Sequence, residues 1–292
     1  MTSGTKVSPP EASAAERRPL AIVCGGGDFP IIAAQAAAAA GRAPFLIGLV
    51  GSADQRIEAF PHLWLRLGEI GKFLNALAQR NIVEIAAIGV VKRPEFADLR
   101  IDFGAMKRLP ALAALFAGGD NRLLAGVGKL LEKEGLTLVG VHDLAPRLLA
   151  PEGALARRLP SAEALGDARL GAAAITALSP FDVGQAAIVA KGRVLAIEAA
   201  EGTDAMLARV AEMRASGRLG LKGRAGVLVK APKQGQEMRL DMPAVGLTTI
   251  EAASRAGLEG VALAAGRVLV MDREACARAA DEASLFLNGM AL

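Results

Sequence analysis

The stretch Leu20–Pro30, "LAIVCGGGDFP", joins an apolar run to three consecutive glycines, an acid, an aromatic residue and a proline. A short apolar run that ends in glycine is typical of a buried strand. Pro30 suits the first turn of a helix, because its missing N–H would be unpaired there anyway. The stretch therefore predicts a strand, a tight turn and a helix, which is how a parallel α/β sheet begins.

The same alternation of apolar runs and helical patterns continues through the first half of the chain. Strands are expected at 20–24, 44–50, 63–67, 84–90 and 137–141, and helices at 30–40, 70–80, 103–116 and 121–134. This order predicts a Rossmann-like parallel sheet with helices on both faces.

The pattern changes near Pro151. A helix is expected at 161–178, a hairpin about Lys191-Gly192, a strand at 226–230 and a final helix at 273–287. The "GRVL" of 192–195 recurs at 266–269, which predicts a second pair of short strands about Ala265-Gly266. The second half is thus expected to be an α+β domain with a mixed sheet.

Three segments follow from these patterns: a disordered tail at 1–19, an N-terminal α/β domain at 20–148 and a C-terminal domain at 149–292. A ligand cleft is expected between the two domains. The tail lacks the apolar core of a secretory signal, and no apolar run is long enough to predict a membrane span.

Composition narrows the class of protein. The net charge of +4 favours anionic ligands, whereas the absence of Tyr and the single Trp leave few platforms for stacking nucleic-acid bases. We therefore expect no nucleic-acid partner. Cys24 and Cys276 lie far apart, without metal spacing, which fits a reducing cytoplasm and two buried thiols.

The glycine stretch resembles a dinucleotide fingerprint only in part. Pro30 stands where the third glycine is required, and no acid ends the second strand before Asp54. A nicotinamide cofactor is therefore disfavoured. The turn can still offer backbone N–H groups and a helix dipole to an anion, and the alternative is a tight turn with no ligand.

Polar residues cluster in the second half. Lys230 and Lys233 lie at the end of a strand, where ligands of open sheets bind. Polar residues occupy alternate positions after them, which predicts that their side chains point to one face of an extended segment. Acids near a basic loop suit a metal-assisted phosphate site, although a solvated basic face and helix caps are the plainer alternatives. Lys92 and Arg93 follow a strand in the first half, and Asp120 and Asn121 precede a helix.

Six motifs occur in order: "GGGDFP", "VVKRPEF", "GGDNRLL", "FDVGQ", "EAAEGTDAML" and "LVKAPKQGQEMRLDMPAVG". Together, from about Leu20 to Asn288, they resemble the bacterial UDP-2,3-diacylglucosamine pyrophosphatase family of lipid A biosynthesis. The resemblance implies hydrolysis of the glycolipid nucleotide to UMP and 2,3-diacylglucosamine 1-phosphate (lipid X), with water attacking the α-phosphorus. It also implies a requirement for Mg²⁺ or Mn²⁺ and a homodimer. The protein would be cytoplasmic, from a Gram-negative bacterium, and able to contact the inner membrane peripherally.

The motifs and the resemblance give candidate site residues. Catalytic candidates are Asp182, Glu201, Asp204 and Asp241, and metal candidates are Asp204 and Glu237. Substrate-binding candidates are Gly25, Gly26, Gly27, Asp28, Phe29, Lys92, Arg93, Asp120, Asn121, Gln185, Thr203, Lys230, Lys233, Gln236 and Arg239.

One position departs from the expected pattern, because Ala225 stands where the resemblance implies an acid. The chain can therefore be an inactive form that retains bound ligand. Two further alternatives stay open: a non-catalytic nucleotide-sugar or lipid-binding protein, and an NAD-dependent oxidoreductase.

Overall fold

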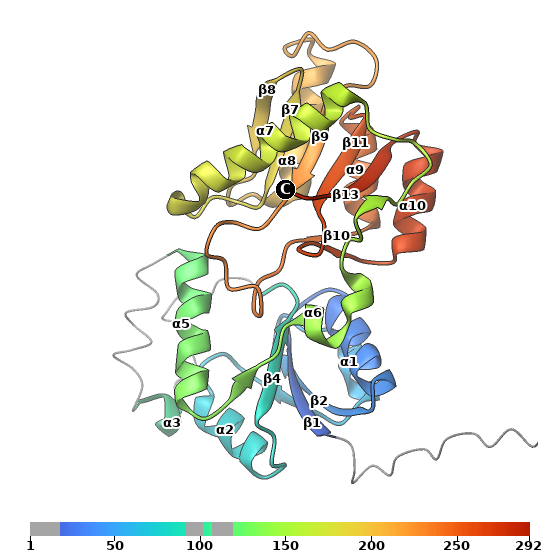
Figure 1. Ribbon diagram of the computed structural model, residues 1–292. Coiled ribbons are helices and arrows are strands. Elements are labelled where there is room, and N and C mark those ends of the chain that lie inside the picture. Colours follow the sequence, from blue (N-terminus) through green and yellow to red (C-terminus); the bar gives the residue numbers. More distant parts are fainter. Residues whose placement is uncertain (1–17, 92–101, 107–118) are drawn as a thin grey trace, which may run out of the picture. The chain divides into compact units, whose positions relative to one another are not determined.

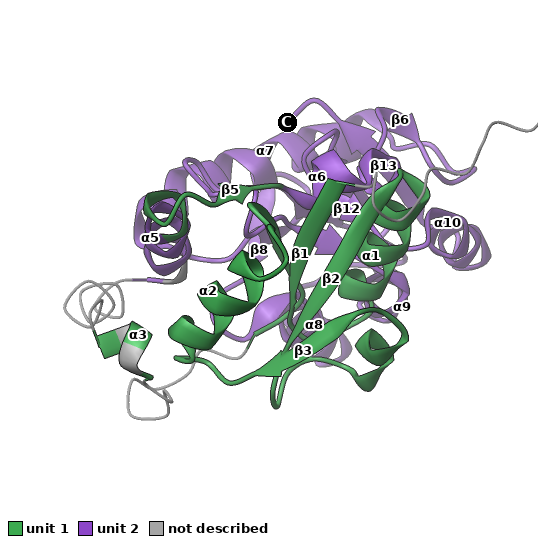
Figure 2. Ribbon diagram, turned by 90° about the horizontal axis from the view of Figure 1, so that it is seen from below, with its two compact units in different colours: residues 1–110, 131–139 green, residues 111–130, 140–292 purple. Residues whose placement is uncertain are grey.

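The computed structural model describes residues 18–91, 102–106 and 119–292 (Figure 1). The chain forms two compact units, coloured separately in Figure 2: residues 1–110 and 131–139 make unit 1, and residues 111–130 and 140–292 make unit 2. The domain boundary at 148/149 stays a prediction.

Unit 1 is built on a five-stranded parallel sheet with the order β3-β2-β1-β4-β5. Its strands are β1 (Arg18–Cys24), β2 (Arg42–Leu49), β3 (His62–Leu65), β4 (Glu84–Ile88) and β5 (Thr137–Leu138). Its helices are α1 (Phe29–Ala39), the 3₁₀ turn η1 (Gln55–Ala59), α2 (Ile70–Ala78) and the described part of α3 (Phe103–Met106). All five predicted strands are present, and the rest of the helix predicted at 103–116 lies outside the described residues.

Unit 2 is built on a six-stranded mixed sheet with the order β6-β13-β11-β9-β7-β8. The strands β9 (Val227–Lys230), β11 (Gly260–Ala264) and β13 (Phe286–Met290) are mutually parallel. The strands β6 (Gly153–Ala154), β7 (Ala186–Ala190) and β8 (Arg193–Ile197) pair antiparallel with their neighbours. A parallel sheet flanked by helices and a mixed sheet in the C-terminal part confirm the predicted fold class.

Helices cover both faces of the mixed sheet. The helix α7 (Ala162–Leu178) packs on β7 and β9 and crosses the near face of the sheet in Figure 1. The helices α8 (Gly202–Ala215), α9 (Leu247–Arg255) and α10 (Arg273–Glu282) pack side by side. Because α9 and α10 each connect two parallel neighbouring strands, right-handed crossovers place them on one face.

Close packing of α7 depends on a glycine. A Cβ at Gly171 would lie 2.6 Å from Val229 Cγ2 and 3.2 Å from Val189 Cγ2, both on strands beneath the helix. The core below consists of small and branched apolar side chains, and Ile175 of the helix and Val227 and Val229 of β9 are almost completely buried. The missing side chain therefore lets the helix lie close to the sheet.

The second half differs from expectation in some details. The two short strands expected about Ala265-Gly266 are present as β11 and β12 (Leu269–Val270), but they do not form a hairpin, since β11 joins the large sheet whereas β12 pairs with β10 (Ala244–Val245) in a separate two-stranded sheet. The final helix ends at Glu282, and the chain turns at Ser284 to form β13. Neither β13 nor α9 is foreseen, because apolar periodicity does not separate short buried strands from helix ends.

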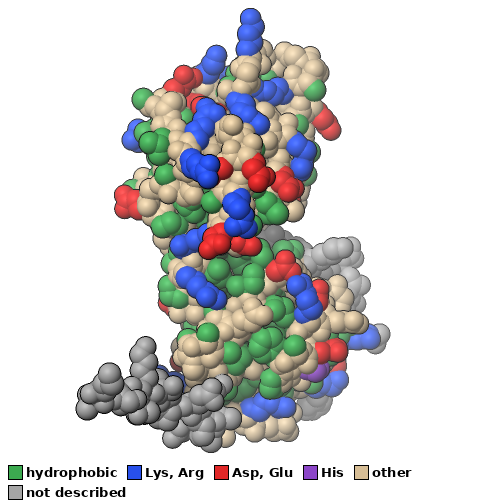
Figure 3. Space-filling view, turned by 90° about the vertical axis from the view of Figure 1, so that its right-hand side faces the viewer, with side chains coloured by type: hydrophobic (Ala, Val, Ile, Leu, Met, Phe, Trp, Pro, Cys, Tyr) green, Lys and Arg blue, Asp and Glu red, His purple; other side chains and the backbone are tan. Residues whose placement is uncertain are grey.

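The remaining elements are short or connect the others. They are α5 (Asp120–Lys133), α6 (Val141–Leu144), and the 3₁₀ turns η3 (Pro146–Leu148) and η4 (Ser179–Phe181). No helix in the described ranges is long and apolar enough to cross a bilayer. On the face in Figure 3, acidic side chains lie among the Lys and Arg side chains, so the basic excess is dispersed there.

Candidate active site

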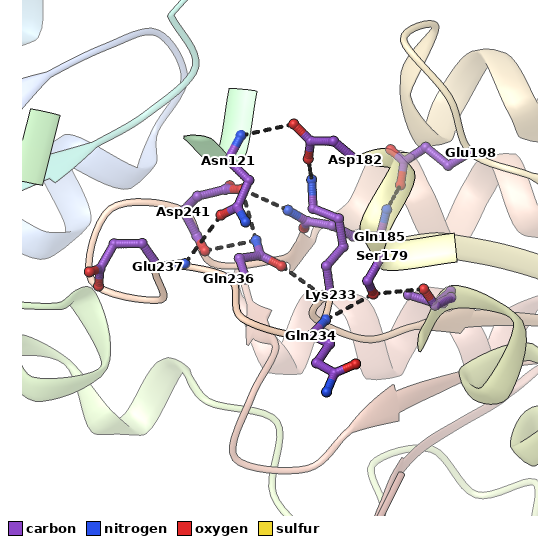
Figure 4. A network of polar contacts seen from close by, with 11 residues as sticks. Asn121, Ser179, Asp182, Gln185, Glu198, Lys233, Gln234, Gln236, Glu237 and Asp241 are labelled. Carbon is purple, nitrogen blue, oxygen red and sulfur yellow. Dashed lines mark hydrogen bonds and ion pairs between the residues drawn. The ribbon is translucent and has the colours of Figure 1, made fainter. Parts of the chain in front are cut away.

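A polar network forms in unit 2 where β9 ends (Figure 4). β9 delivers Lys230, and the loop after it delivers Lys233 and Gln236. The side chains of Lys230 and Lys233 are only 8% and 7% exposed. Buried ammonium groups require compensating carboxylates or ligand anions, so their partners define the site.

Asp241 receives two amide donors. Gln185 Nε2 and Gln236 Nε2 donate to its Oδ2 at 2.9 and 2.8 Å, and Gln236 also donates to the Asp241 backbone carbonyl. Burial raises the pKa of Asp241 above its usual value, and Lys233, Gln236 and Lys230 oppose the shift in part. Among the described residues no hydrogen bond reaches Asp241 Oδ1, so this oxygen can accept a proton.

Asp182 connects the loop after β9 to the start of α5. Lys233 Nζ donates to Asp182 Oδ1 at 2.6 Å, and the Asn121 backbone N–H donates to Oδ2 at 3.1 Å. Asp182 has a φ of 53°, in the left-handed region. Gly119 is required beside it, because a Cβ there would overlap the Asp182 carboxylate. The conformation of this turn thus places the Asp182 carboxylate within hydrogen-bond distance of Lys233 Nζ.

A second buried carboxylate supports Lys230. Glu198 accepts hydrogen bonds from the Gln185 backbone N–H and the Thr203 hydroxyl, both at 2.8 Å. Lys230 Nζ donates to Thr203 Oγ1 at 2.5 Å and lies 3.6 Å from Glu198 Oε2. Thr203, in the first turn of α8, therefore also orients the Lys230 side chain.

The other acidic candidates have structural partners. Glu201 is paired with Arg209 at 2.7 Å, and Asp204 is exposed in the first turn of α8, where it favours the helix dipole. Glu237 is paired with Arg239 at 2.6 Å, and this guanidinium lowers the pKa of the Glu237 carboxyl. Asp182 and Asp241 are the candidate acids that share the lysine network.

The predicted metal pair does not form a recognisable metal site. In the described ranges, no three His, Cys, Asp or Glu side chains are grouped as ligands of one ion. Glu237 already holds an arginine through two of its hydrogen-bond donors. The described side chains therefore do not fit a metal held by protein ligands alone, and Asp204 and Glu237 stay predictions as ligands.

In unit 1 the triple glycine turn has its own structural role. Gly25 N–H donates to Ile88 O and Gly26 N–H to Val90 O, each at 2.8 Å, and a Cβ at Gly25 would collide with the backbone of Gly89. Gly27 has a φ of 88°. Two of the three glycine N–H groups are thus engaged with the end of β4 and the residues directly after it.

The rest of the turn has donors without an acceptor among the described residues. The N–H groups of Gly27, Asp28 and Phe29 have no acceptor within the described part of the chain. The Asp28 carboxylate pairs with Arg56 at 2.5 Å. Lys92 and Arg93 lie outside the described residues, and for Asp120 only the backbone, the first residue of α5, is described.

Position 225 lies before β9, whereas the network lies where β9 ends. Ala225 precedes the first residue of β9 by two positions, and Lys230 is the last residue of that strand. Ala225 is 8% exposed, its N–H donates to Gly257 O, and its carbonyl accepts from Arg214. The structure therefore does not bring position 225 to the lysines or to Asp241.

Sequence reasoning missed part of the network. Glu198 is a buried carboxylate that joins Gln185, Thr203 and Lys230, and its only sequence signal is an acid directly after an apolar strand. Ser179 is also absent from the prediction, although its hydroxyl accepts the Gln234 N–H and donates to Ile175 O, both at 2.9 Å. A serine next to a proline carries no signal for such a role.

Two family models match the two halves of this chain. Residues 19–148 match the family model "LpxI N-terminal domain", and residues 151–288 match "LpxI C-terminal domain". The chain is 40% identical over 273 residues to the UDP-2,3-diacylglucosamine pyrophosphatase LpxI of Caulobacter vibrioides, covering 94% of this chain and 98% of that protein. The chain therefore belongs to the LpxI family.

Proposed function

We propose that this protein hydrolyses UDP-2,3-diacylglucosamine to UMP and 2,3-diacylglucosamine 1-phosphate, a step of lipid A biosynthesis. The observation that carries the proposal is its 40% identity, along nearly the whole of both chains, to a protein named for that pyrophosphatase activity. The buried lysines and carboxylates at the end of β9 support it, because a diphosphate needs cations and its hydrolysis needs a base.

In this proposal Lys230 and Lys233 bind the diphosphate. Each ammonium has three donors, and the hydrogen bonds described use one donor of each. Glu198 and Asp182 keep the two ammonium groups in place and partly neutralised until the substrate arrives. Phosphate oxygens then replace water around the remaining donors.

Asp241 is the proposed general base. Its Oδ2 is held by Gln185 and Gln236, which leaves Oδ1 to accept a proton from the attacking water. Among the acidic candidates, Asp241 has a pKa raised by burial, which makes it a better proton acceptor than an ordinary carboxylate. The bond from the bridging oxygen to the α-phosphorus breaks, and the lipid phosphate leaves.

The test is turnover by the purified chain in ¹⁸O-labelled water. We expect UMP and lipid X as products, with the label in UMP, since water attacks the α-phosphorus. Label in the lipid phosphate would contradict that position of attack, and the absence of turnover at any metal concentration would contradict the activity.

The alternative is a protein that binds the substrate without hydrolysing it. The same experiment distinguishes this binding protein from an enzyme. Tight binding of the substrate without turnover would favour it. Ala225 does not favour that alternative, because position 225 precedes β9 whereas Lys230 and Lys233 lie at and beyond its other end. An oxidoreductase is disfavoured further, because Gly25 and Gly26 use their N–H groups to bond Ile88 at the end of β4 and Val90 beyond it.

Several finer properties remain proposals. They are a requirement for Mg²⁺ or Mn²⁺, homodimer formation, a cytoplasmic location and peripheral contact with the cytoplasmic face of the inner membrane. Activity after chelation tests the metal requirement, and sedimentation equilibrium tests the dimer. Co-sedimentation with vesicles tests the membrane contact.

A further inference from the structure

The turn Ser179–Asp182 places an aromatic side chain in solvent. Phe181 is 76% exposed, and its neighbours fix the turn: Pro180 lies in the first turn of η4, and Ser179 Oγ bonds both Ile175 and Gln234. A large apolar ring that stays exposed on a rigid turn gains no burial in the fold. Its position next to Asp182 suggests that a ligand covers it.

An open pocket of about 320 Å³ adjoins this turn. Ser179, Pro180 and Asp182 line it on one side, and Gly119, Asn121 and Arg122 line it on the other. Phe181 stands between two of the lining residues in the chain, Pro180 and Asp182, and its own side chain is not part of the lining. A stack on a ligand in this pocket therefore requires the ring to turn toward it by rotation about its two side-chain torsions.

The pocket offers hydrogen-bond donors for which the described residues supply no acceptor. The backbone N–H of Asn121 bonds Asp182, and its Oδ1 accepts the Glu237 N–H at 3.4 Å. Its side-chain NH₂ has no partner within the described ranges, and the exposed guanidinium of Arg122 has none there either. Donors beside an aromatic ring match a flat ligand whose edge carries carbonyl oxygens.

We propose that this pocket is the subsite for the uracil base of the nucleotide, with the base stacked on Phe181 and its ring carbonyls accepting from Asn121 and Arg122. The proposal rests on the function proposed above and extends it to base recognition. The position is consistent with the phosphate site, because Asp182 lines the pocket and also holds Lys233. An acyl chain would need an apolar lining, whereas this lining is mostly polar.

The experiment is calorimetric titration of the full chain with UMP, AMP, ribose 5-phosphate and lipid X. For Phe181→Ala we expect UMP affinity to fall roughly 5- to 150-fold, the usual range for loss of one base–aromatic stack. Phe181→Trp keeps a flat ring and should retain UMP binding. Lipid X, which has no base, should bind both variants as it binds the wild type.

Two comparisons sharpen the test. Leu159→Ala removes another exposed apolar side chain, 69% exposed and outside the pocket, and should leave every affinity unchanged. Arg122→Ala should weaken UMP binding and narrow the preference for UMP over AMP, because AMP lacks the ring carbonyls.

Two results would overturn the uracil subsite: wild-type affinity for UMP no greater than for ribose 5-phosphate, or loss of lipid X rather than UMP binding in Phe181→Ala. Failure of the proposed function looks different. In that case the wild type binds UMP through Phe181 as expected and does not hydrolyse the glycolipid nucleotide.

Discussion

At the scale of single residues, the carboxylates of the network differ in what surrounds them. Asp182 contacts an ammonium directly, whereas Asp241 is held by two amides and faces its lysines without a direct bond. For Asp241 the loss of water outweighs these stabilising contacts, so burial raises its pKa. This contrast separates a carboxylate that orients a lysine from one that is suited to accept a proton.

Asp241→Asn should lower kcat by about 10²–10⁴-fold, the contribution of a general base, with little change in KM. The amide keeps the shape of the side chain but cannot accept the proton of water. Steady-state kinetics measure the effect, and Glu274→Gln, at an acid on α10 whose side chain is 89% exposed, is the control. Equal losses in the two variants would contradict the assignment.

The same residue sets a pH dependence. The base works as a carboxylate, so kcat/KM should rise with pH through the raised pKa of Asp241, above the range of an ordinary aspartate. The sign for stability is the reverse: a folded-state pKa above the unfolded one contributes stability that is lost as pH rises through it. A pH profile without an acidic limb would argue against Asp241.

Lys233→Met should destabilise the protein by about 3 kcal/mol, because it leaves the Asp182 carboxylate without its ammonium partner. Asp182→Asn in the same chain should recover part of this loss. Urea unfolding of the wild type, both single variants and the double variant gives the coupling free energy. Additive effects would show that the contact contributes nothing to stability.

Ala225→Asp should not raise turnover, because position 225 precedes β9 whereas the lysines lie at and beyond the other end of that strand. It should lower the free energy of unfolding by at least about 1–3 kcal/mol, since it buries a polar group at a site that is 8% exposed. Activity and melting temperature are measured together. A large gain in hydrolysis would instead restore the idea of an inactive chain.

At the scale of elements, helix α7 shows how a missing side chain sets the distance between a helix and a sheet. Gly171→Ala should cost about 1–3 kcal/mol, because its methyl group would overlap Val229. Gly166→Ala in the same helix should stabilise by about 0.4–1 kcal/mol, since nothing lies within 4 Å of its Cβ and alanine favours helix. Chemical unfolding tests both, and a similar effect at the two positions would refute this packing.

Elements of unit 1 follow closely from local sequence, whereas those of unit 2 do so less well. Strands buried on both faces, such as β1 and β4, give continuous apolar runs that end in glycine. The strand β13 follows α10, and in the sequence its apolar residues continue the helical pattern. Its register beside β11 arises from pairing between residues far apart in the chain.

At the scale of the whole molecule, the proposed metal requirement can be separated from folding. Chelation with EDTA should abolish hydrolysis, and Mg²⁺ or Mn²⁺ should restore it. The melting temperature should not change, because the carboxylates of the network are already held by lysines and amides. A marked fall in melting temperature would indicate a structural metal instead, and full activity in EDTA would refute the requirement.

The sequence by itself determined the alternation of strands and helices, the residue types of the site and the order of its motifs. These are local properties, because apolar periodicity and turn chemistry act over a few residues. Which acids share the lysines was decided only by the tertiary structure. Lys233 meets Asp182 from 51 positions away, Gln185 meets Asp241 from 56, and Ala225 is kept apart by the length of one strand.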